Sequence, residues 1–186
     1  MSSNQELIAA HAFAINVTGL PASWGLLSAS VITLSAGAVG QVGLAISPTA
    51  PLIGGANYPF TVNVDATDIA LSASDGDTFV VPASPYAWLN APAHALFAAP
   101  GGTTVVSLTL KNVGNAPGAF PLSMTIPAGW AHDAPTGLSV AAGDTRAQTV
   151  TVATTGTLFS QYVVRAGTRS LGYDQSAYAV VILVTP

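Results

Sequence analysis

The alternation of apolar and polar residues between residues 100 and 130 constrains the fold more than any other feature of this chain. Apolar residues occupy every second position from Val106 to Leu110 and again from Phe120 to Ile126. Side chains along a β-strand point alternately to opposite faces, so such a stretch buries one face and leaves the other in water. The segment between the two stretches, Asn112–Gly118, is rich in Gly, Asn and Pro, which favour turns. The pattern predicts two antiparallel strands, followed by a corner at Pro127–Trp130.

This corner has a second copy roughly 100 residues earlier in the chain. Pro21–Trp24 repeats the spacing of Pro127–Trp130, and an alternating stretch, Phe13–Val17, precedes it. Short alternating stretches separated by turn residues follow each corner, which is typical of repeated β-sandwiches. The sequence therefore predicts an all-β fold of two tandem sandwiches, the first over residues 1–84 and the second over residues 85–186.

The charge content excludes several classes of partner. Only 6% of the residues are charged, against about 25% in an ordinary soluble domain. Nucleic-acid binding depends on clustered Lys and Arg, and we expect none because the chain has four such residues and a net charge of −4. We expect no membrane insertion, since the longest apolar run, Ala177–Val184, is too short to span a bilayer. The chain has no Cys, which excludes disulfides and thiolate chemistry.

The order of motifs in the second half resembles that of a known family. It runs from Asn112–Asn115, through Pro127–Trp130, to Leu138–Asp144 and an alternating Thr-Val stretch. This order is similar to that of bacterial immunoglobulin-like modules of the alpha-galactosidase-associated and cell-adhesion-related type. The resemblance covers residues 93–186 well and residues 12–81 more loosely. It implies an immunoglobulin-like fold and a spacer, adhesive repeat or accessory module of an exported protein, located outside the cell or at its surface.

The first copy departs from the pattern of the second. In the second copy, a predicted strand at Thr103–Lys111 and an edge strand between Ala93 and Ala98 precede the first matched strand, but only Ser2–Ala10 precedes it in the first copy. A sandwich without a central strand has unpaired backbone groups and an open apolar groove. Three explanations remain open: the sequence is cut from a longer protein, residues 2–10 rebuild part of the sheet, or a neighbouring molecule supplies a strand.

Half of the acidic residues lie close together in the sequence, at Asp65, Asp68, Asp75 and Asp77. Ca²⁺ binds several carboxylate oxygens on a loop, so these residues are a candidate calcium site. Asp and Gly are also favoured by turns, and Asp75-Gly76-Asp77 predicts a hairpin turn ahead of a strand at 78–81. The cluster therefore has a metal-binding and a purely structural interpretation.

Tyr86 and Trp88 are the candidate ligand-binding residues, because they lie in the segment that joins the two copies. Sugars stack on exposed aromatic rings, and ligand sites favour domain boundaries. The structural alternative is that both rings pack the joint between the copies. Exposure of the two rings would favour carbohydrate binding.

We find no catalytic motif and expect no enzyme activity, since the three His residues are scattered and no nucleophile elbow or phosphate-binding loop is present. The leading functional hypothesis is a non-catalytic structural or adhesive module of an exported surface protein, in its most specific form a filament subunit completed by strand exchange. We expect self-association, or neighbouring domains of a larger protein, as its partners. The alternative is a carbohydrate-binding accessory module of a secreted glycosidase. No cofactor other than Ca²⁺ is expected.

Overall fold

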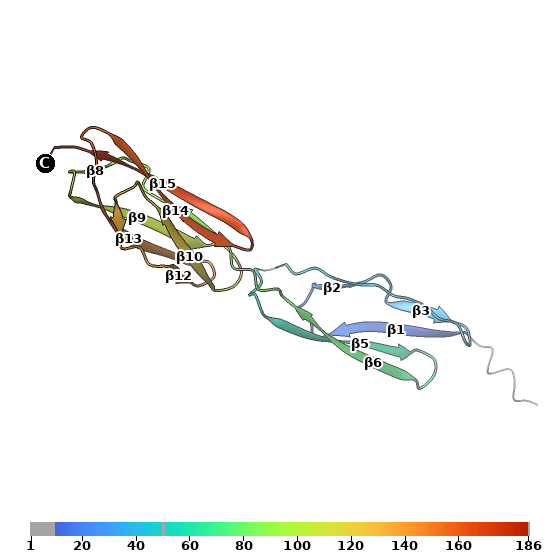
Figure 1. Ribbon diagram of the computed structural model, residues 1–186. Helices are drawn as coiled ribbons and strands as arrows, with labels where there is room; N and C mark the ends of the chain where they lie inside the picture. The colour runs from blue at the N-terminus through green and yellow to red at the C-terminus, as the bar shows by residue number, and fades with distance from the viewer. Residues whose placement is uncertain (1–9, 50, 186) are drawn as a thin grey trace, which may run out of the picture. The chain divides into compact units, whose positions relative to one another are not determined.

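The computed structural model describes residues 10–49 and 51–185, and all regular secondary structure in these residues is β-strand (Figure 1). The prediction of an all-β fold is therefore confirmed. The chain divides into two compact units, Met1–Pro82 and Ala83–Pro186. The described residues contain no helix, and hence none that could cross a membrane.

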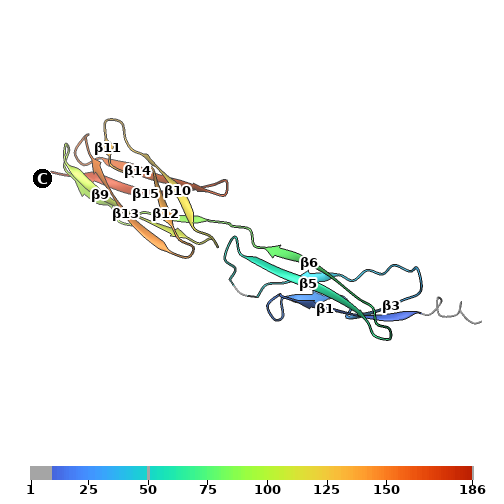
Figure 2. The ribbon, with the colours of Figure 1, turned by 90° about the horizontal axis from the view of Figure 1, so that it is seen from below.

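The second unit is a complete β-sandwich of two sheets (Figures 1 and 2). All neighbouring strands are antiparallel except β8, which runs parallel to the end of β15. One sheet has the order β12 (Gly137–Val140), β10 (Gly118–Thr125), β14 (Gln161–Ser170), β15 (Tyr173–Leu183) and β8 (Leu96–Ala98). The other has the order β11 (Ala131–His132), β13 (Thr145–Ala153), β9 (Thr103–Asn112) and β7 (Ala87–Asn90).

The alternating residues of the sequence form the core of this sandwich. The inward residues of β9 (Val106, Leu108 and Leu110) are at most 1% exposed, and Phe120 of β10 is 2% exposed. They pack against inward residues of β13, β14 and β15 in one continuous apolar cluster. The first strand of the sandwich is split into two parts: β7 joins one sheet and β8 joins the other. Two facing sheets that are antiparallel apart from β8, with a first strand split in this way, form an immunoglobulin-like sandwich.

The first unit has one four-stranded sheet and a separate two-stranded ribbon. The sheet has the order β3 (Val31–Leu34), β1 (His11–Thr18), β5 (Asn57–Ala66) and β6 (Ser72–Val80), and the ribbon pairs β2 (Gly25–Leu27) with β4 (Leu44–Ile46). The sheet corresponds to β12-β10-β14-β15 of the second unit, and the ribbon corresponds to β11-β13. The first unit thus repeats six strands of the second in the same order along the chain.

The two Trp corners have the same geometry. The amide of Trp24 donates to the carbonyl of Pro21, and the amide of Trp130 donates to the carbonyl of Pro127, each at 3.2 Å. The residue before each Trp has a left-handed backbone, with φ of 69° at Ser23 and 82° at Gly129. Each corner Trp packs on a Tyr of the third strand of its sheet, β5 or β14: the ring centroids of Trp24 and Tyr58 are 4.7 Å apart, and those of Trp130 and Tyr162 are 5.1 Å apart.

Candidate functional site: the open face of the first unit

Three strands of the second unit have no counterpart among the described strands of the first. In the second unit, β9 pairs with β13 along its whole length, β7 pairs with β9, and β8 pairs with β15. In the first unit, β4 pairs only with β2, and β6 pairs only with β5, within residues 10–49 and 51–185. The edges where β9 and β8 would add are therefore free of strand partners in the described structure.

The missing strands leave the inner face of the first unit's sheet partly exposed. Because Tyr58 and Tyr162 occupy the same place beside the corner Trp, β5 can be aligned with β14 on these two residues. The next inward residues of β5 (Phe60, Val62 and Val64) are then equivalent to Val164, Ala166 and Thr168 of β14. The three β14 residues are at most 5% exposed, whereas the three β5 residues are only half-buried. We call the inner surface of β5 and β6 the open face.

The core of the first unit is correspondingly small. Of the 23 buried apolar residues in the described chain, only Ile15, Trp24 and Val81 belong to this unit. The ribbon adds a shallow apolar hollow of about 300 Å³, lined by Leu26, Leu44 and their neighbours. Leu26 is 72% exposed, although an apolar side chain gains about 25 cal/mol for each Å² removed from water. The first unit therefore has unburied apolar surface that a further strand could cover.

The edge strand β6 carries two carboxylates on the open face. Residues directly opposite each other in a strand pair project to the same side of a sheet. Asp77 pairs with Phe60, and Asp75 pairs with Val62, so both carboxylates share the face of these apolar residues. Phe79, two residues further on, confirms this direction because its ring lies 6.4 Å from that of Tyr58.

The predicted hairpin turn at Asp75-Gly76-Asp77 is wrong, because these residues lie inside β6. The real connection between β5 and β6 lies earlier, where the amide of Ala66 donates to the carbonyl of Leu71 at 2.8 Å. Each carboxylate accepts a hydrogen bond from the next amide, Asp75 from Gly76 at 2.9 Å and Asp77 from Thr78 at 2.7 Å. Pairing with the apolar strand β5 outweighs the local turn preference of the Asp-Gly-Asp segment.

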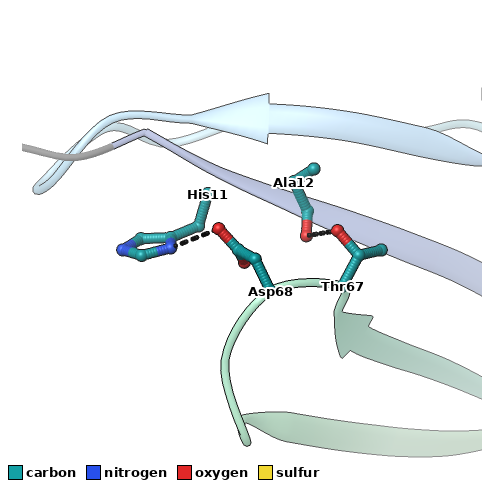
Figure 3. Close-up of polar contacts among 4 residues, drawn as sticks. All are labelled: His11, Ala12, Thr67 and Asp68. Carbon is teal, nitrogen blue, oxygen red and sulfur yellow. Dashed lines mark hydrogen bonds and ion pairs between the residues drawn. The ribbon is translucent and has the colours of Figure 1, made fainter.

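The four candidate calcium ligands do not converge. Asp65 pairs with Ser72 and projects to the opposite face of the sheet from Asp75 and Asp77. Asp68 lies in the connection between β5 and β6, where its carboxylate is 2.9 Å from Nδ1 of His11 (Figure 3). Within the described residues, no group of three or more acidic or His side chains could hold a metal ion. A calcium site at these residues stays a prediction that requires further ligands.

The contact between Asp68 and His11 belongs to a local clamp at the end of the sheet. Beside it, the hydroxyl and the amide of Thr67 both donate to the carbonyl of Ala12, at 3.2 and 2.9 Å (Figure 3). These contacts hold the β5–β6 connection against the start of β1. We interpret them as structural, since they fix two neighbouring chain segments.

Tyr86 and Trp88 have different environments. The hydroxyl of Tyr86 accepts a hydrogen bond from the side chain of Gln175 at 3.0 Å, and its ring lies 6.4 Å from that of Tyr173. Trp88 is 53% exposed on the outer side of β7, and its indole donates to the side chain of Asn90 at 3.2 Å. Trp88 is therefore the exposed member of the pair, whereas Tyr86 is packed within the second unit.

The scattered His residues form no relay in the described chain. His132 and Asp133 are adjacent but bind different groups: Nδ1 of His132 accepts from the amide of Ala134, and the carboxylate of Asp133 accepts from the amide of Thr151 at 2.7 Å. The hydrogen bond from Thr151 lowers the pKa of Asp133 below its ordinary value. This hydrogen bond holds Asp133, which follows β11, against β13.

Comparison with known proteins adds no family. No family model matches the sequence, and no curated protein matches it. Among solved structures, the chain is similar to E. coli alpha-2-macroglobulin in its native conformation, with 18% identity, a TM-score of 0.42, and coverage of 85% of this chain and 10% of that one. It is similar to the D0-D1 domain of intimin, with 14% identity and a TM-score of 0.35, and the match covers 97% of this chain and 86% of that one. It is also similar to a chain of the CsuC-CsuE chaperone-tip adhesion subunit complex of Acinetobacter baumannii, with 13% identity, a TM-score of 0.30, and coverage of 95% and 87%.

Proposed function

We propose that this protein is a non-catalytic structural or adhesive module of an exported surface protein, and that a neighbouring molecule supplies a strand to its first unit, as in a filament. The observation that supports this proposal is the strand inventory: the first unit repeats the order of the second but lacks counterparts of β7, β8 and β9 among its described strands. Adding a strand to a free sheet edge supplies backbone hydrogen bonds and covers apolar side chains at the same time.

The matching corners and strand orders also support the interpretation of the two units as tandem copies, 1–84 and 85–186, of one bacterial immunoglobulin-like module of the alpha-galactosidase-associated or cell-adhesion-related type. No catalytic residue can be carried over from modules of this type to this chain. The low charge of the chain fits such a role, because a surface with few charges associates more readily with a neighbour than a strongly charged one.

Light scattering after size-exclusion chromatography tests self-completion between copies. A filament built from copies of this chain predicts a mass that rises above 18.6 kDa with protein concentration, whereas a strand supplied by a different protein predicts a constant mass of 18.6 kDa. The variant Leu44→Lys places a charge on β4, the strand beside the expected insertion, and should weaken association at least about tenfold, because burying a Leu contributes roughly 2 kcal/mol. Val163→Lys is the matched control, since Val163 is an apolar residue of the second unit that is already 54% exposed.

The control should associate like the parent protein, and circular dichroism should show that both variants keep their strand content. A mass of 18.6 kDa at every concentration would contradict a filament built from copies of this chain alone. Equal weakening by both substitutions would place the contact outside the first unit.

A second candidate function, a carbohydrate-binding accessory module of a secreted glycosidase, rests on the exposure of Trp88 alone, because Tyr86 is packed within the second unit. Trp24 and Trp130 are 5% and 8% exposed, so a fluorescence change on adding soluble polysaccharide would report mainly on Trp88. If this function holds, Trp88→Ala should abolish the change, whereas Tyr178→Ala, which removes another exposed aromatic ring of the same unit, should retain it. No change with any of several soluble glucans and xylans would argue against carbohydrate binding.

A further inference from the structure

The last strands of the two units, β6 and β15, carry different kinds of side chain on their inner faces. Tyr58 pairs with Phe79 in the first unit, and Tyr162 pairs with Val181 in the second, so β6 can be aligned with β15 on these pairs. In this alignment Asp75 and Asp77 are equivalent to Ala177 and Ala179. Both Ala residues are buried, at 7% and 1% exposed, and β7 packs against their strand. Both Asp residues are exposed.

A strand like β7 could not cover the open face of the first unit. The inward residues of β7 are Ala87 and Leu89, which suit the small apolar surface of Ala177 and Ala179. The same apolar side chains placed over Asp75 and Asp77 would bury two carboxylates with no cation beside them. This is costly, because a buried charge without an opposite charge loses its hydration and gains no ion pair in return. The incoming strand must therefore bring partners for these charges.

Lys and Arg side chains can cover the apolar residues of the open face and also pair with its two carboxylates. Their aliphatic stems can cover the rings and methyl groups of Phe60 and Val62, while their cationic ends reach the carboxylates of Asp75 and Asp77. The chain's own basic residues are all in strands of the second unit: Lys111 in β9, Arg146 in β13, and Arg165 and Arg169 in β14. These strands already form the sandwich of that unit, so the charge pattern favours a segment of a different protein.

We propose that the open face accepts an extended segment of another protein that places Lys or Arg side chains opposite Asp75 and Asp77. This inference rests on the proposed addition of a strand to the first unit and specifies the chemistry of that strand. A different role is known for charges on edge strands, where they prevent sheet edges from pairing with one another. The two roles predict different responses to a basic segment.

Two peptide probes with equal charge separate these roles. Both derive from residues 85–98, which contain β7 and β8, and carry a fluorescent label. One contains Ala87→Lys, an inward position, and the other contains Asn90→Lys, an outward position of the same strand. We expect the peptide with Ala87→Lys to bind the full protein about tenfold more tightly, measured by fluorescence anisotropy, because close interfacial charge pairs contribute about 1.5 kcal/mol or more.

Variants of the protein locate the preference. Asp75→Asn combined with Asp77→Asn removes both charges but keeps side-chain oxygens that can accept from Gly76 and Thr78, and it should abolish the tenfold difference. Asp65→Asn removes a carboxylate charge from the opposite face of the same sheet, so the tenfold difference in affinity between the two peptides should remain. Raising the salt concentration should reduce the preference, since exposed charges are screened.

The outcomes distinguish two kinds of failure. If neither peptide nor the unsubstituted parent peptide binds, the first unit accepts no strand and the proposed function fails with it. If both Lys peptides bind equally, strand addition stands and the selection of basic side chains is overturned. If the double Asn variant self-associates while the peptides show no preference, the two carboxylates protect the edge of β6 and the inference is wrong.

Discussion

Backbone amides of β1 and β5 should exchange with solvent roughly a thousandfold faster than those of β9, β10 and β14 in the isolated protein. Protection against exchange follows the free energy of opening, and each 1.4 kcal/mol changes it about tenfold. Among the described residues, the second unit contains 20 of the 23 buried apolar side chains, and the first contains three. A difference of about 4 kcal/mol in opening free energy is modest for such unequal cores. Hydrogen-exchange mass spectrometry of the intact protein measures both units at once.

The second unit is the internal control of this experiment, because both units experience the same solvent, pH and temperature. Adding a peptide that completes the first unit should raise the protection of β5 and β6 and leave β9 and β10 unchanged. Equal protection of the two units in a monomeric sample would contradict the proposal, since it would mean that the first unit is stable without any added strand.

The parts of the fold that the sequence predicts depend on local patterns. The alternation in β9 and β10 and the spacing of the Trp corners are set within a few residues, and the structure places Trp24 and Trp130 in matching surroundings. The short strand β8 (Leu96–Ala98) lies within the predicted edge segment, between Ala93 and Ala98.

The parts that the sequence does not predict depend on pairing between distant residues. Asp75-Gly76-Asp77 has turn composition, but its position in β6 is set by register against Phe60 and Val62 of β5. The side on which the two carboxylates project follows from that register, so the charged open face could not be found from composition. The separation of Tyr86 from Trp88 likewise depends on a contact with Gln175, far along the chain.

Asn112→Ala should lower the free energy of unfolding of the second unit by about 4 kcal/mol, because an unsatisfied buried polar group costs about 1–3 kcal/mol. The Asn112 side chain is fully buried and makes four hydrogen bonds. Its oxygen accepts from the amides of Tyr86 and Gly114 at 3.3 and 3.0 Å, and its nitrogen donates to the carbonyls of Ala116 and Val140 at 2.8 and 3.1 Å. The substitution leaves all four backbone groups without this partner.

Urea denaturation followed by Trp130 fluorescence, in a background with Trp24→Phe and Trp88→Phe, measures this change in the second unit alone. Asn90→Ala is the matched control, because Asn90 is exposed and the indole of Trp88, which donates to its side chain, is already removed in this background, so its effect should stay within about 0.5 kcal/mol. A loss below about 1 kcal/mol for Asn112→Ala would show that water replaces the amide at little cost.

The same hydrogen bonds fix in the second unit a strand, β7, that has no counterpart among the described strands of the first. Asn112 binds the amide of Tyr86 immediately before β7, and the amide of Val113 donates to the carbonyl of Tyr86 at 2.8 Å. The loop after β9 thereby holds the entry of β7 in place, and Gly114 lies so close to Ser84 and Pro85 that a Cβ would meet their backbone. Asn112→Ala should therefore also speed amide exchange in β7 more than in β13, which would connect the loss of stability to release of β7, the strand without a counterpart among the described strands of the first unit.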